Sequence, residues 1–225
     1  MTQRRLAVLG ALGALSLLFV AMIVVRQAYS GEPVHRWLVW NLFLAWVPLL
    51  FALAVYDGAR RGIGRLPLLA LGALWLLFFP NAPYLVTDLK YVGQFSDVPL
   101  WYDVVLLSTG AWAGLALGFI SLYLMHAVAR RAWGALNAWL AVGFALALSS
   151  FGVFLGRFER WNSWDVFTDP GLIARQLADG LANPLDYPRA LAVTAVFTMF
   201  LGTTYLVFYA FARLSDALGD ESRSA

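Results

Sequence analysis

The sequence lacks cysteine and is poor in charged residues and in histidine. Without cysteine the chain can form no disulfide, no thiolate metal site and no cysteine nucleophile. Charged residues make up 13% of the chain, whereas soluble domains have about 25%. There is no dense run of Lys or Arg and no nucleic-acid motif, so we exclude a nucleic acid as partner. We also find no HExxH, GxSxG or Walker A pattern.

Apolar residues dominate instead, at 61% of the 225 residues, with a mean hydropathy of +0.72. A membrane-spanning helix needs about 20 predominantly apolar residues, and the sequence offers about six such runs. These features predict an all-α, polytopic transmembrane helix bundle that forms a single integral-membrane domain over residues 1–225. The predicted spans are residues 6–25, 37–55, 66–86, 100–128, 133–155 and 190–212.

The first apolar run could be a signal peptide, since Arg4 and Arg5 precede it and Ala28-Tyr29-Ser30 resembles a cleavage site. Its 20 residues exceed the usual 7–15 of a signal-peptide core, which favours a retained anchor. The loops after the second and fourth runs are short and rich in Arg. The positive-inside rule therefore predicts that both termini lie in the cytoplasm.

The third run contains FPNAPY at residues 79–84. Residues 66–79 would span about 21 Å as a helix, which is less than the roughly 30 Å bilayer core. Pro80 and Pro83 remove amide donors, and Ala82, before a proline, is expected to be extended. We expect a broken third helix, which can line a binding site in a membrane protein. The alternative is a proline kink in which Asn81 covers freed backbone groups.

Two carboxylates flank the start of the fourth run. Asp88 follows the FPNAPY segment, and Asp103 lies in the expected first turn, where a helix dipole favours negative charge. Trp101 and Tyr102 beside it are typical of an ordinary interfacial aromatic belt.

The stretch GRFERWNSWD, residues 156–165, follows the fifth run. If the helix continues outward, Arg157, Arg160, Trp161 and Trp164 share one face. Arginine binds carboxylate or phosphate in a bidentate manner, so the cluster suggests either an anion clamp or a purely structural network. One arginine could equally neutralise a helix C-terminus.

A short amphipathic helix is expected before the last span. Asp169 is a candidate N-cap, Pro170 suits the first helical position, and the helix would end near Ala182. It could lie in the membrane interface and cover the outer site, or pack onto the bundle.

Glycines recur every fourth residue in the fourth run, at Gly110, Gly114 and Gly118. This spacing allows close approach of helices, and packing within the bundle is the favoured interpretation. His126 and His35 have no metal-ligating partner at useful spacing, so we expect no metal site.

The segments FFPNAPYLVTDL, WYD and GRFERWNSWD occur in this order between apolar helices. In this respect the chain resembles a bacterial membrane family known as domain of unknown function 1361, over roughly residues 35–212. The resemblance implies a multi-pass bacterial membrane protein, which we expect in the inner (cytoplasmic) membrane. It supplies no activity and no catalytic residue.

Three functions stay open. The first is binding or transport of an anionic or lipid-like ligand, such as a phospholipid head group, at the outer face. The second is an outer-leaflet enzyme that acts on a phosphate-bearing or lipid-linked substrate, with Asp88, Asp103 or Asp165 as general base. Only this enzyme would use a cofactor, Mg²⁺. The third is an accessory subunit. The lipid bilayer is the expected partner, and the oligomeric state stays open. The candidate ligand-binding residues are Asn81, Tyr84, Asp88, Asp103, Arg157, Arg160, Trp161, Asn162, Trp164 and Asp165.

Overall fold

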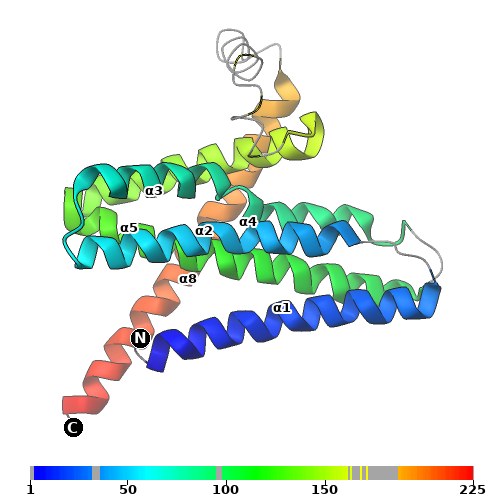
Figure 1. The fold of residues 1–225 in the computed structure, drawn as a ribbon, viewed down its shortest axis with the longest axis horizontal. Coiled ribbons are helices and arrows are strands. Elements are labelled where there is room, and N and C mark those ends of the chain that lie inside the picture. The colour runs from blue at the N-terminus through cyan, green and yellow to red at the C-terminus, as the bar shows by residue number, and fades with distance from the viewer. Residues whose placement is uncertain are drawn as a thin grey trace. The chain divides into compact units, whose positions relative to one another are not determined.

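The structure, a computed structural model, describes residues 3–31, 36–94, 98–161 and 187–224, together with positions 163, 168 and 171. All regular secondary structure in these residues is helical, as predicted (Figure 1). The chain divides into two compact units, residues 1–125 and 126–225, and each is described by itself. The elements are α1 (Gln3–Ser30), α2 (Arg36–Arg60), α3 (Arg65–Phe78), α4 (Asn81–Tyr84), the 3-10 helix η1 (Leu85–Tyr91), α5 (Leu100–Phe154), the π-helix η2 (Leu155–Glu159) and α8 (Pro188–Ser224).

Five described helices are long and apolar enough to cross a membrane. One of them, Leu100–Glu159, has 60 residues and would measure about 90 Å if straight, far more than a bilayer core. It is interrupted at Gly134, whose φ of 81° and ψ of 174° are not helical. The rings of His126 and Trp139, on either side of Gly134, have centroids 4.5 Å apart, so the chain reverses there. Two crossings within this segment agree with about six spans, and the protein is an integral, multi-pass membrane protein.

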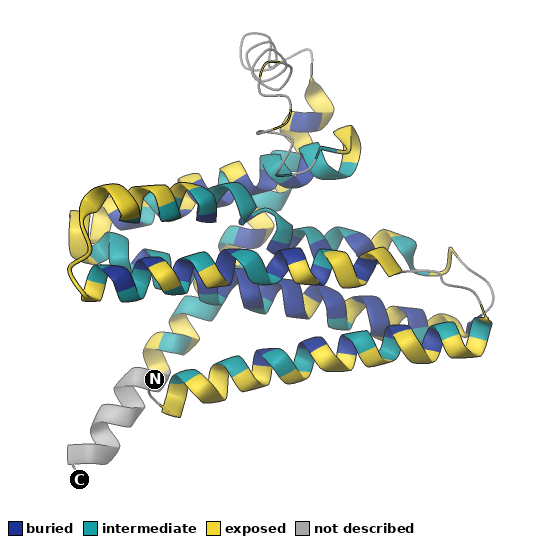
Figure 2. Cartoon of the chain, in the orientation of Figure 1, coloured by how far each residue is buried: buried dark blue, intermediate teal, exposed yellow. Residues whose placement is uncertain are grey.

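In unit 1, one face of α1 is buried along the first half of α5 and against α2 (Figure 2). Helices α1 and α5 run antiparallel, because Phe19 lies against Gly110 while the later residue Arg26 lies against the earlier residue Asp103. The indole N–H of Trp46, in α2, donates to the hydroxyl of Ser16 at 3.1 Å. The buried residues of α1 are spaced alternately by four and three, as on a coiled-coil face. They are Leu12, Ser16, Phe19, Ile23 and Arg26.

The third predicted span is broken in its hydrogen bonding while its backbone stays right-handed helical. Phe79 and Pro80 have helical φ and ψ, and α4 and η1 follow directly. The expectation that Ala82 is extended is wrong, because Ala82 lies inside α4. Its amide donates to the carbonyl of Phe79 at 3.2 Å. This hydrogen bond spans three residues, as in a 3-10 helix. In an α-helix the Phe79 carbonyl would accept from residue 83, but Pro83 has no amide hydrogen.

Close packing holds this break in place. Asn81 Nδ2 donates to the carbonyl of Phe78 at 2.9 Å, the arrangement expected from the proline-kink interpretation.

On the facing side, a Cβ added to Gly114 would collide with the carbonyl oxygen of Ala82, and one added to Gly118 would lie 3.2 Å from the Ala82 Cβ. A Cβ on Gly110 would lie 2.6 Å from the Phe19 ring. The packing interpretation of these glycines is therefore confirmed.

Candidate functional site

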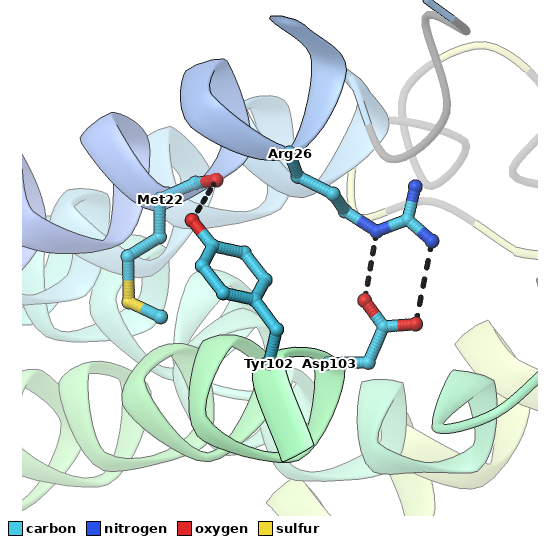
Figure 3. A network of polar contacts seen from close by, with 4 residues as sticks. All are labelled: Met22, Arg26, Tyr102 and Asp103. Carbon is cyan, nitrogen blue, oxygen red and sulfur yellow. Dashed lines mark hydrogen bonds and ion pairs between the residues drawn. The ribbon is translucent and has the colours of Figure 1, made fainter. Parts of the chain in front are cut away.

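Asp103 forms an ion pair with Arg26, a residue that was not among the sequence candidates (Figure 3). Arg26 Nε donates to Asp103 Oδ1 at 2.8 Å and Nη2 donates to Oδ2 at 3.3 Å. Both side chains are 1% exposed. The bidentate geometry compensates much of the cost of removing two charges from water, which is otherwise several kcal/mol per ion. The pair joins α1 to the first turn of α5.

Tyr102 strengthens the same junction. Its hydroxyl donates to the main-chain carbonyl of Met22 at 2.9 Å (Figure 3). Trp101, next to it, is 66% exposed and fits the interfacial aromatic belt expected for both residues. Tyr102 therefore also contributes a specific contact between α1 and α5.

Asp88 is also buried, at 2% exposure. It lies in η1 and accepts a hydrogen bond from Asn41 Nδ2, on α2, at 3.2 Å. Nearby in sequence, Thr87 Oγ1 donates to the carbonyl of Tyr84 at 2.6 Å. The 3-10 helix η1, which follows FPNAPY, therefore brings a carboxylate into contact with α2. Tyr84, at the end of FPNAPY, is half-buried.

In unit 2, the stretch GRFERW ends a helix and does not extend it. Residues 155–159 form one π-helical turn, and Arg160 adopts a left-handed conformation with φ of 60°. The amides of Arg160 and Trp161 both donate to the carbonyl of Leu155. The helix therefore does not continue outward past Arg160 as an α-helix, which was the condition for a shared face of Arg157, Arg160 and Trp161. Trp164, the fourth residue of that face, lies outside the described residues.

This ending turns cationic side chains toward the surface. Arg160 is exposed, whereas Arg157 and Trp161 are half-buried. Single π turns occur frequently at functional sites, and a left-handed non-glycine residue costs about 1–2 kcal/mol. The sequence carries no sign of either feature, since both depend on how the helix end is packed.

The first turn of α8 adds a third arginine. The guanidinium of Arg189 lies 4.2 Å from the centroid of the Phe158 ring. Phe158 in turn lies beside Phe154, with centroids 5.2 Å apart, and Phe154 beside Phe151. We call Arg157, Arg160 and Arg189 the arginine surface. Next to it, the three phenylalanines form an apolar row along the end of α5 and into η2.

The remaining sequence candidates, Asn162, Trp164 and Asp165, lie outside the described residues. The expected amphipathic helix lies outside them too, apart from Gly171, which is helical. Among the residues that the structure does describe, no group of three or more His, Asp or Glu side chains could hold a metal ion.

A family model described as protein of unknown function (DUF1361) matches residues 40–207. The chain belongs to the DUF1361 family. No curated protein and no solved structure matches the chain. The DUF1361 match contains Asp88, Asp103 and the arginine surface but not Arg26, so the ion pair joins the matched region to a helix that precedes it.

The DUF1361 chain also has a buried aromatic cluster around His126. His126 is 2% exposed, its Nδ1 lies 3.1 Å from the Tyr205 hydroxyl, and its ring stacks on Tyr209. Arg130 Nη1 donates to the Tyr209 hydroxyl at 2.7 Å. The sequence gives no signal for this cluster, because Tyr205 lies 79 residues after His126 along the chain. Arg26 could have been found, because it continues the alternating spacing of Phe19 and Ile23.

Proposed function

We propose that this membrane protein binds an anionic, lipid-like ligand at the arginine surface, on the outer face of the membrane. The supporting observation is that two arginines at adjoining helix ends are exposed beside an apolar row. Arg160 and Arg189 have no carboxylate within ion-pair distance among the described residues. Guanidinium groups bind phosphate and carboxylate oxygens in a bidentate manner.

The row of Phe151, Phe154 and Phe158 supports an amphiphilic ligand over a simple anion. It runs from the end of α5 into η2, where Phe158 contacts Arg189. An acyl chain could pack against Phe158, which is 38% exposed, and against the half-buried Phe151, while its head group pairs with the guanidinium groups. A small inorganic anion would make no use of the apolar row.

Binding has more support than catalysis. An outer-leaflet enzyme would need a carboxylate that is free to accept a proton from a substrate. Both oxygens of Asp103 accept hydrogen bonds from Arg26 inside a buried pair. An accessory subunit with its glycines as interfaces also has less support, because Gly110, Gly114 and Gly118 are covered within unit 1.

Lipid binding can be measured by native mass spectrometry of the purified protein released from detergent, after titration with phosphatidylglycerol or phosphatidylcholine. The test variant is Arg160→Gln/Arg189→Gln. Each lost charge-assisted bond is worth about 1.5–3 kcal/mol, so we expect at least a tenfold loss of phosphatidylglycerol affinity. Phosphatidylcholine binding should change little.

The matched control is Arg60→Gln/Arg61→Gln, which removes two exposed arginines, one at the last residue of α2 and one directly after it. It should retain the affinity of the wild type. An equal loss in both variants, or no loss in either, would show that the arginine surface is not a specific binding site.

A further inference from the structure

Three buried polar atoms of unit 2 have no hydrogen-bond partner among the described residues. They are His126 Nε2, Ser149 Oγ and Thr194 Oγ1. A buried polar group without a partner costs about 1–3 kcal/mol, and a bilayer core offers no water to satisfy it. Neighbouring hydroxyls avoid this cost: those of Ser150 and Thr198 donate to carbonyls one turn earlier, at 2.8 and 2.7 Å.

Two of these atoms lie at the same level of the α5–α8 pair. Trp139 on α5 contacts Tyr205 on α8, with ring centroids 6.3 Å apart. From these contact points, Ser149 lies about 15 Å along α5 and Thr194 about 16 Å along α8, at 1.5 Å per residue. The two helices run in opposite directions, since Phe158 contacts Arg189 further along. Ser149 and Thr194 therefore both lie between the arginine surface and the level of Tyr205.

The third atom lies at the far end of the same helix pair. His126 is held by the Tyr205 hydroxyl at Nδ1 and by the rings of Trp139 and Tyr209. Arg130 adds a positive charge beside this cluster, through its bond to the Tyr209 hydroxyl. Polar groups thus occur at three levels of unit 2: the arginines, the hydroxyls and the imidazole.

We infer that α5 and α8 line a hydrated polar passage that leads from the arginine surface to His126. Water or the anionic oxygens of a head group would supply the partners that the three atoms lack, since hydroxyl and imidazole groups can donate to such oxygens. Intramembrane polar groups mark substrate paths in other membrane proteins. This inference rests on the proposed function and extends it from binding to the passage of a ligand head group.

Cysteine substitution tests the passage directly, because the chain has no cysteine of its own. Ser149→Cys and Thr194→Cys are made separately and reconstituted in vesicles. Each is treated with 2-sulfonatoethyl methanethiosulfonate, an anionic reagent that does not cross membranes. Thiols in apolar surroundings stay protonated and unreactive, so both variants should react at least about tenfold faster than buried controls.

The matched controls are Ala145→Cys, one turn earlier on α5, and Leu201→Cys on α8, both of which are buried at 4% and 1% exposure. Faster labelling of both test positions supports the passage. Labelling no faster than the controls overturns it, whether or not phosphatidylglycerol still binds. The lipid titration is run on the same variants, so that loss of the passage and loss of the binding site are told apart.

Discussion

At the scale of single residues, a buried arginine is paired with a buried aspartate, which lowers the cost of placing either charge inside a membrane protein. Arg26 and Asp103 are both fully buried and paired. A second pair, Arg5 and Asp57, joins α1 to α2 at 2.8 Å, but its side chains are 26% and 39% exposed. The two pairs share a shortest N–O distance of 2.8 Å but differ in burial, so they should differ sharply in their contribution to stability.

We expect Arg26→Met or Asp103→Leu alone to lower the free energy of unfolding by about 3–5 kcal/mol, because each leaves one buried charge without its partner. The double variant should recover most of that loss. Unfolding in detergent, followed by tryptophan fluorescence, measures this cycle. The comparison is Arg5→Met and Asp57→Leu, each expected to cost no more than about 1 kcal/mol. Additive losses at Arg26 and Asp103 would contradict coupling between them.

At the scale of elements, composition predicts helices well and helix interruptions less well. The apolar runs identify the spans, and Pro80 and Pro83 correctly signal a break in the third. The sequence did not reveal that Ala82 stays helical, because that depends on Gly114 leaving room for its carbonyl. Nor did it reveal the π turn at residues 155–159, in which one extra residue is accommodated at the end of the helix.

The close contact at Gly114 gives a prediction for these elements. Gly114→Ala should lower the free energy of unfolding by about 1–3 kcal/mol, because the new methyl group would overlap the Ala82 carbonyl. Gly143→Ala is the control, since a Cβ there meets nothing within 4 Å. It should be neutral or stabilise by up to about 1 kcal/mol, as expected for alanine in a helix. Thermal unfolding in detergent separates the two, and equal effects would rule out a steric role for Gly114.

At the scale of the whole molecule, an even number of spans requires both termini on the same side of the membrane. The distribution of arginine between loops predicts that this side is the cytoplasm. The loop between α2 and α3 would then be internal, and the loop between η1 and α5 external. The proposed outer position of the arginine surface depends on this orientation.

The natural lack of cysteine also makes the orientation measurable. We expect Gln94→Cys to be labelled in intact cells by an impermeant thiol reagent, and Arg61→Cys to be labelled only after the cells are opened. The opposite pattern would invert the topology and place the arginine surface on the cytoplasmic face. Labelling of both positions in intact cells would contradict a membrane crossing by α3, α4 and η1.

The sequence alone determined that this is a multi-pass helical membrane protein of the DUF1361 family, and roughly where its helices begin and end. It could do so because a bilayer imposes a local requirement, about 20 apolar residues per crossing, that composition satisfies or fails. The tertiary structure decided that Asp103 pairs with Arg26, that Ala82 packs on Gly114, and that Arg160 and Arg189 come to adjoining helix ends. These facts join residues that are far apart in the chain. Only the packing of whole helices, with its steric and electrostatic requirements, selects such partners.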